Sequence, residues 1–82
     1  MDLNKIREHR ARMKFSNTRF STREKQIEES GELISELEYP TSETNLRKEI
    51  FDNFVTLTAL CDNRGIDIDE LIEWGIGVNE SR

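Results

Sequence analysis

Acidic side chains gather at two places in this sequence, and their spacing could bring them together. The first group is Glu28, Glu29 and Glu32, and the second group is Glu49 and Asp52. At 100° per residue, the three glutamates of the first group fall within an arc of about 100° on a helix, away from Ile27 and Ile34. The second pair, three residues apart, also shares one helix face. If the two helices pack antiparallel, we expect the five carboxylates to converge.

Such a collection of carboxylates has an energetic cost that a bound cation would offset. The glutamate pairs Glu28/Glu32 and Glu32/Glu36 are four residues apart, and each such like-charge pair destabilises a helix by about 0.2–0.5 kcal/mol. Glu49 and Asp52 lie in the most apolar helix that we expect, where an unpaired charge is costly. Oxygen ligands without His or Cys are typical of Mg²⁺ or Mn²⁺ sites rather than zinc sites. The alternative interpretation is a solvated acidic helix surface.

The elements that would position these residues are helices. The sequence has one proline and no strand-like alternation, which indicates an all-α chain. We expect one domain over 1–82, with a basic N-terminal helix at 2–13 and a loop completing the segment 1–20, then helices at 21–38, 43–63 and 67–75 and a tail at 76–82.

Capping signals set these boundaries. Ser21 with Glu24, and Asp67 with Glu70, have the spacing of a capping box at a helix N-terminus. The stop signals are Pro40, Gly65, Gly75 and Gly77.

The apolar residues predict a bundle that one chain does not complete. Ile27, Ile34 and Leu37 form a stripe on the second helix, and Ile50, Phe54, Leu57 and Cys61 form one on the third. A chain of 82 residues buries only about 60% of its unfolded surface, and a single cysteine cannot form an internal disulfide. We therefore expect a short bundle of three to four helices per chain, completed by homo-oligomerisation as a homodimer or homotetramer.

The charge is distributed unevenly along the chain. The net charge is −5, but residues 1–25 have eight basic and three acidic side chains. The nearest candidates for contacts with an anionic ligand are Lys14, Arg19, Arg23 and Lys25. The alternative interpretation of this segment is a solvated polar helix with a mobile arm. The chain as a whole is acidic and has no recognised nucleic-acid motif, which argues against a nucleic-acid partner. It has no apolar run long enough for a membrane span and no signal-peptide core, so we expect a cytoplasmic protein.

The two acidic groups together resemble a known family signature. Glu28-Glu29-Ser30-Gly31-Glu32, followed after sixteen residues by Glu49-Ile50-Phe51-Asp52, resembles the E-E-x-x-E…E-x-x-D motif of the MazG-like all-α nucleoside triphosphate pyrophosphatases. Lys25 precedes the first glutamate at the family's spacing, and Asn79-Glu80-Ser81-Arg82 resembles the family's terminal N-x-x-R. The resemblance covers about residues 20–82.

This resemblance implies an activity and a set of roles. Members of the family cleave a (d)NTP between the α and β phosphates, giving a monophosphate and pyrophosphate, with Mg²⁺ bound in a dimeric helical bundle. By motif position, the metal ligands would be Glu29, Glu32, Glu49 and Asp52, with Glu28 as a further ligand or supporting group. Glu29 or Glu32 would accept the proton of the attacking water. The substrate-binding candidates are Lys25, Lys14, Arg19, Asn79 and Arg82.

One departure from the family pattern leaves other functions open. Gly75 stands where the family often has a lysine, so another basic residue would have to neutralise the phosphates. A non-catalytic module that binds a nucleotide or a protein partner is the alternative. A relative specialised for phosphoribosyl-ATP is a third interpretation. The sequence does not specify the base, the sugar or the number of metals per site.

Overall fold

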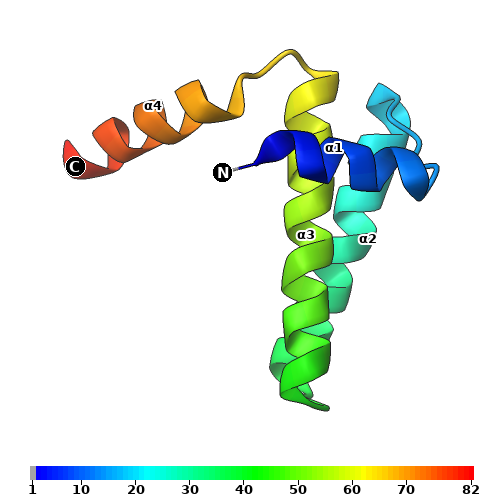
Figure 1. Ribbon diagram of the computed structural model, residues 1–82. Coiled ribbons are helices and arrows are strands. Elements are labelled where there is room, and N and C mark those ends of the chain that lie inside the picture. The colour runs from blue at the N-terminus through cyan, green and yellow to red at the C-terminus, as the bar shows by residue number, and fades with distance from the viewer. Residues whose placement is uncertain (1) are drawn as a thin grey trace.

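The chain folds into four helices joined by short connections. The computed structural model describes residues 2–82, and its helices are α1 (Leu3–Arg12), α2 (Arg19–Glu38), α3 (Glu43–Asn63) and α4 (Ile68–Glu80) (Figure 1). The described residues contain no strand. The all-α prediction is therefore confirmed, and α3 has the predicted bounds.

Two of the predicted helix ends were wrong. Helix α2 begins at Arg19, because the Thr18 side chain accepts a hydrogen bond from the Ser21 backbone N–H, and the Ser21 hydroxyl bonds back to Thr18. The predicted Ser21–Glu24 box therefore does not form. The predicted short helix 67–75 and tail 76–82 were also wrong, because α4 continues through Gly75 and Gly77 to Glu80. Neither glycine has a positive φ, so neither makes the left-handed turn with which glycines commonly end helices.

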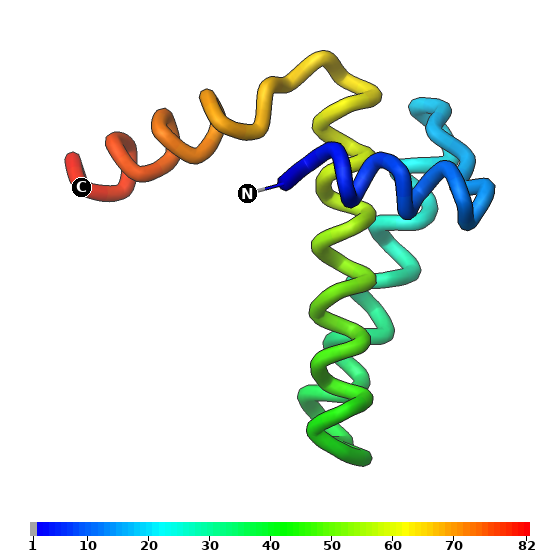
Figure 2. Tube along the Cα trace, in the orientation of Figure 1, coloured from blue at the N-terminus to red at the C-terminus, as the bar shows by residue number. Residues whose placement is uncertain are grey.

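Helices α2 and α3 form an antiparallel hairpin (Figure 2). Hydrogen bonds between polar side chains fix the register of the two helices. The Thr56 hydroxyl bonds to Gln26 Oε1 at 2.7 Å, and Gln26 Nε2 donates to Asn53 Oδ1 at 3.2 Å. Thr56 and Asn53 are almost fully buried, with exposures of 2% and 8%. Because each buried polar group needs its particular partner, a shifted register would leave several of them unpaired.

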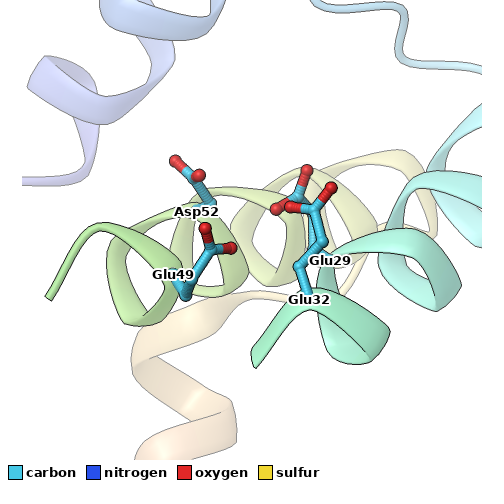
Figure 3. Close-up of side chains that lie close together, drawn as sticks. All are labelled: Glu29, Glu32, Glu49 and Asp52. Atoms are coloured by element: carbon cyan, nitrogen blue, oxygen red, sulfur yellow. The ribbon is translucent and has the colours of Figure 1, made fainter. Parts of the chain in front are cut away.

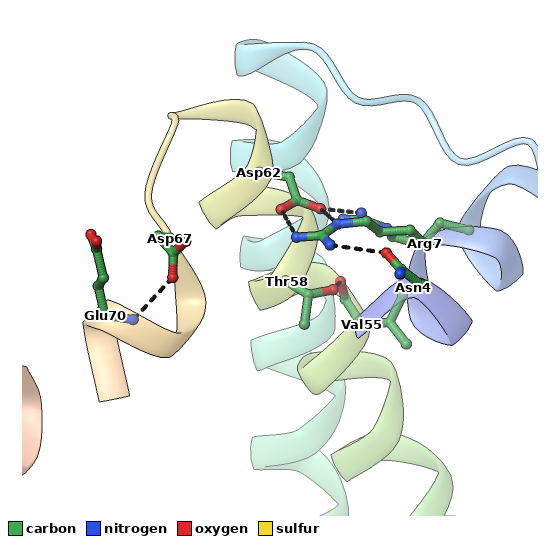
Figure 4. Close-up of polar contacts among 8 residues, drawn as sticks. Asn4, Arg7, Val55, Thr58, Asp62, Asp67 and Glu70 are labelled. Atoms are coloured by element: carbon green, nitrogen blue, oxygen red, sulfur yellow. Dashed lines mark hydrogen bonds and ion pairs between the residues drawn. The ribbon is translucent and has the colours of Figure 1, made fainter. Parts of the chain in front are cut away.

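Helix α1 lies across α3 and is fixed there by a pair of arginines. Arg7 donates to both oxygens of Asp62, through Nη2 at 2.9 Å and through Nε at 3.0 Å (Figure 4). Arg10 Nη2 also donates to Asp62. These hydrogen bonds, first of all that from Arg7, hold the pKa of Asp62 below its usual value, although its partial burial opposes this. The carboxylate therefore stays charged and keeps α1 on the hairpin.

Helix α4 points away from the other three helices, and the chain is open in shape. None of the residues of α4 is buried, and Figure 1 shows the helix projecting from the end of α3. The radius of gyration is 14.1 Å, against about 12 Å for a compact domain of this length. Among the described residues, Val55 and Ala59 are the only buried apolar side chains.

Large apolar side chains are correspondingly exposed on the hairpin and on α4. Five of the seven stripe residues of the hairpin have exposed fractions between 50% and 61%, whereas Phe54 and Cys61 are half-buried: the five are Ile27, Ile34, Leu37, Ile50 and Leu57. On α4, Trp74 is 65% exposed and Ile76 is 51% exposed. The predicted stripes exist, but this chain alone does not cover them. We call the five hairpin residues the apolar hairpin face. None of the helices in the part of the chain described here has the length and hydropathy that crossing a membrane requires.

Candidate metal centre

Four of the five predicted carboxylates converge between α2 and α3. One carboxylate oxygen from each of Glu29, Glu32, Glu49 and Asp52 lies within 4.8 Å of the others. Figure 3 shows the four carboxyl groups directed to the same side of the two helices. Each helix supplies a pair at a spacing of three residues, so the helical period places both members of a pair on one face. The antiparallel hairpin then brings the two pairs together.

The cluster fits a divalent cation in both its donor atoms and its burial. Glu29 is only 5% exposed, Glu49 and Asp52 are half-buried, and Glu32 is exposed. Glu29 Oε2 and Glu49 Oε2 are buried without any hydrogen-bond partner. A buried carboxylate oxygen without a partner is costly. Carboxylate oxygens are the ligands that Mg²⁺ and Mn²⁺ prefer, so these residues would hold such an ion.

A lysine partly compensates the negative charge of the cluster. Lys25 Nζ lies 3.3 Å from Glu29 Oε1 and 3.7 Å from Glu28 Oε2. Burial raises the pKa of Glu29, and the neighbouring charges of Glu32 and Asp52 raise it further, against the opposing effect of Lys25. Burial also works against the charged form of Lys25, but its carboxylate neighbours outweigh this and raise its pKa. One ammonium group thus faces several carboxylates that share a small space.

Asn53 connects the two halves of the cluster through the backbone. Its side-chain Nδ2 donates to the carbonyl oxygens of both Glu29 and Glu49, each at 2.9 Å. These two residues belong to opposite helices and are both members of the cluster. A single buried amide therefore fixes the distance between the helix turns from which the carboxylates extend. The sequence offers no spacing rule for this residue, because its two partners are determined by how the hairpin packs.

The other predicted site residues lie around the cluster or away from it. Glu28 has a side chain that is 57% exposed, and it is not one of the four converging carboxylates. Lys14 lines a hollow together with Lys25, beside the cluster. Arg19 is exposed at the start of α2, where its carbonyl oxygen accepts from Arg64 Nη2 at 3.3 Å.

The C-terminal candidates are separated from the cluster within one chain. Asn79 lies in the last turn of α4 and Arg82 follows it, and both are exposed. Because α4 projects away from the hairpin (Figure 1), their contact with a substrate stays a prediction.

One residue that sequence reasoning passed over is well placed beside the cluster. Arg10 of α1 is only 8% exposed, and it lines a pocket that Glu29 and Asp52 also line. Arginines are distributed around the whole of α1, so the sequence pattern offers no reason to single out this one. Its partner Asp62 is 52 residues away in the chain, and only the tertiary structure shows the pair.

Comparisons with protein-family models, with curated proteins and with solved structures found no match to this chain. The likeness to the MazG-like family therefore depends on the motif residues themselves.

Proposed function

We propose that this protein is a Mg²⁺- or Mn²⁺-dependent nucleoside triphosphate pyrophosphohydrolase that acts as a homo-oligomer. The observation that carries the proposal is the convergence of Glu29, Glu32, Glu49 and Asp52 from two helices. Their order and spacing resemble the MazG-like motif, which supports a (d)NTP as the substrate. The products would be a nucleoside monophosphate and pyrophosphate.

The carboxylates need a cation before they can accept such a substrate. A triphosphate has about four negative charges at neutral pH, and the acidic cluster alone would repel it. A divalent metal held by Glu29, Glu49 and Asp52 would offset this repulsion and act as a Lewis acid toward a phosphoryl oxygen. Lys25, released from one of its carboxylate partners, would contact a phosphate group.

Hydrolysis requires one carboxylate to take a proton. In the proposed step, the oxygen of a water molecule bonds to the α-phosphorus while the bond from that phosphorus to the α–β bridging oxygen breaks. Pyrophosphate leaves with the bridging oxygen, and the proton of the water passes to a carboxylate. We assign that role to Glu32, because it is the exposed member of the cluster and a water molecule can approach it. Glu29 is the buried member and is assigned as a ligand.

A second copy of the chain is the proposed cover for the apolar hairpin face and for α4. Side chains such as Leu57 and Trp74 are at least half exposed, and large exposed apolar surfaces are typical of interfaces. Burying it would supply hydrophobic stabilisation that a core of Val55 and Ala59 cannot. The acidic cluster is directed away from Ile27 and Ile34 by helical spacing, so association through that face would leave the cluster accessible.

The test is the release of pyrophosphate from a panel of (d)NTPs, with and without Mg²⁺ or Mn²⁺. Released phosphate is measured before and after adding an inorganic pyrophosphatase, which separates pyrophosphate from direct phosphate release. Glu32→Gln should lower the rate by about 10²- to 10⁴-fold, and Glu49→Gln should abolish the metal-dependent hydrolysis. Glu38→Gln, an exposed change on the same helix as Glu32, is the matched control and should retain the rate. Nucleotide binding without metal-dependent hydrolysis would favour the non-catalytic alternative.

A further inference from the structure

A pocket next to the acidic cluster has groups of opposite charge on its walls. Its volume is about 270 Å³, and it lies between α1, the loop that follows α1, and the hairpin. Glu29 and Asp52 of the cluster line it, and so do Arg10 and Lys25. Phe15 adds an aromatic wall. The pocket thus places Arg10, which is far from the cluster in the sequence, beside the cluster and Lys25.

Buried polar atoms without partners occur on both the acidic and the basic walls. Within residues 2–82, three buried side-chain atoms have no hydrogen-bond partner: Arg10 Nη1, Glu29 Oε2 and Glu49 Oε2. Arg10 and Glu29 both line the pocket. An unpaired buried guanidinium N–H is energetically costly, as is an unpaired buried carboxylate oxygen. Each wall therefore has a buried polar atom whose capacity to pair is unused.

The positive charge of Arg10 is held in place but not neutralised. Its Nη2 donates to Asp62, and Arg7 uses both oxygens of the same carboxylate. Arg10 therefore shares its carboxylate with a second guanidinium group. The Arg10 side chain is only 10% exposed, and its salt bridge to Asp62 orients the guanidinium group. A fixed guanidinium with a free N–H is suited to an oxyanion, whose geometry its donors match.

We infer that Arg10 binds an oxyanion group of a metal-complexed phosphoryl ligand in this pocket, and that Asp62 is the positioning residue that holds Arg10 there. Such a ligand supplies a cation to the carboxylates and an anion to the guanidinium, so it satisfies both walls at once. Lys25 is the second cation that it meets. The inference rests on the proposed function for the metal, and it adds α1 to the substrate-binding surface.

The test uses inorganic pyrophosphate as the probe and the full chain loaded with Mn²⁺. Isothermal titration calorimetry should show that Arg10→Gln weakens pyrophosphate binding by about 10- to 100-fold, as expected for a lost charged hydrogen bond. Arg10→Lys should recover part of the affinity, because it keeps the charge without the fork of donors. Asp62→Asn should give an intermediate loss. Arg12→Gln makes the same charge change at an exposed position of α1 and should bind like wild type.

Mn²⁺ affinity, measured by electron paramagnetic resonance, separates the role of Arg10 from damage to the cluster. Arg10→Gln should bind Mn²⁺ within about threefold of wild type, because Arg10 is not one of the carboxylates. Pyrophosphate affinity of Arg10→Gln equal to that of Arg12→Gln would overturn the inference. So would an equal loss of Mn²⁺ and pyrophosphate affinity.

A measurement on the wild-type protein covers the case in which Arg10→Gln does not fold. The guanidinium NMR signals of Arg10, assigned from the Arg10→Lys spectrum, should shift when pyrophosphate is added to the Mg²⁺-loaded protein. Those of Arg64, which already donates to Thr22 Oγ1 at 2.9 Å, should stay in place. Bound pyrophosphate with an unmoved Arg10 signal would contradict the inference.

The two proposals fail in different ways. Pyrophosphate binding that depends on Arg10, without hydrolysis of any (d)NTP, would refute the proposed enzymatic activity but support the proposed binding site. Metal-dependent hydrolysis with a KM unaffected by Arg10→Gln would refute the role of Arg10 and leave the enzyme.

Discussion

At the scale of single residues, the cluster stores repulsion that a metal ion would relieve. Four carboxylates share a small space, and the oxygens Glu29 Oε2 and Glu49 Oε2 are buried without partners. Lys25 supplies one positive charge against them. The stability of the protein should therefore depend strongly on divalent cations.

Added Mn²⁺ should raise the melting temperature. At a free concentration 100 times the dissociation constant, a ligand specific for the folded state adds about 2.7 kcal/mol, or about 10–20 °C for a chain of this length. Circular dichroism melts with Mn²⁺ and with a chelator measure the difference. The gain should disappear in Asp52→Asn but persist in Glu38→Gln, and an equal gain in both variants would argue against the cluster as the metal site.

Asn53 should affect metal affinity beyond its effect on stability. Asn53→Ala removes the amide that joins the carbonyl oxygens of Glu29 and Glu49. We expect a loss of about 1–2 kcal/mol in unfolding free energy and about a tenfold loss in Mn²⁺ affinity, as for groups that orient ligands. Thr58→Ala is the control, because its buried hydroxyl bonds only to the Val55 carbonyl oxygen at 2.7 Å. It should lose similar stability with unchanged metal affinity.

The Asp62 carboxylate should make the attachment of α1 sensitive to acid. The Arg7 hydrogen bonds lower its pKa in the folded state, so its contribution to stability is present above the unfolded-state pKa of about 3.9. The contribution is lost as the pH falls through the folded-state pKa. Asp62→Asn should cost about 2 kcal/mol at pH 7 and lose less stability than wild type between pH 4 and pH 2. Denaturant titrations of wild type and Asp62→Asn at pH 7, pH 4 and pH 2 measure these differences in stability. Equal losses in the two proteins between pH 4 and pH 2 would contradict the prediction.

At the scale of helices, the sequence predicted the interior of each element better than its ends. The Ser42 and Asp67 side chains accept from backbone N–H groups at the starts of α3 and α4, as their residue types indicate. At the start of α2 the capping box that forms is Thr18 with Ser21, and not the predicted pair of Ser21 with Glu24. Arg64 of the turn after α3 donates to Thr22 next to this cap, and no local sequence pattern predicts such a tertiary contact.

The same distinction applies to the candidate site. The four carboxylates followed from helical spacing and an antiparallel hairpin, because both are local rules. Arg10, Asn53 and Asp62 did not follow, because their roles depend on partners from other helices. Glu28 was also predicted to converge, by helical spacing as well as by motif position, but its side chain is exposed and outside the cluster.

The glycines of α2 and of the turn after α3 should respond oppositely to alanine. Gly31 lies inside α2, and a Cβ added there would meet no atom within 4 Å, so Gly31→Ala should stabilise the chain by about 0.5–1 kcal/mol. Gly65 has a φ of +70°, so Gly65→Ala should destabilise it by about 1–2 kcal/mol. Urea unfolding measures both. If Gly31→Ala destabilises instead, a second chain approaches α2 closely at that position.

At the scale of the whole molecule, the open shape leaves large apolar side chains uncovered. The apolar hairpin face and α4 together expose more apolar side chains than the chain buries. The expectation of an oligomer came from size and apolar pattern, and the exposed stripes support it.

Size-exclusion chromatography with light scattering should give the mass of an oligomer, which is a multiple, twofold or higher, of the 9.7 kDa of one chain. Leu57→Glu places a charge on the apolar hairpin face, where Leu57 is 50% exposed, and should shift the protein toward monomer because burying an unpaired charge is costly. Arg47→Glu, an exposed change on the same helix, should leave the mass unchanged. A stable wild-type monomer would contradict the proposed oligomer.

The separation of α4 from the hairpin also has a kinetic consequence. The hairpin closes through neighbouring segments of one chain, so its formation should be fast and independent of protein concentration. In the proposed oligomer, α4 would be buried only when two chains associate, and the rate of association is second-order in protein concentration. Refolding should then show two phases, and only the slower one should accelerate when the protein is more concentrated. Newly made chains at low abundance would keep α4 exposed for longest, which makes that helix the segment most accessible to proteases and chaperones.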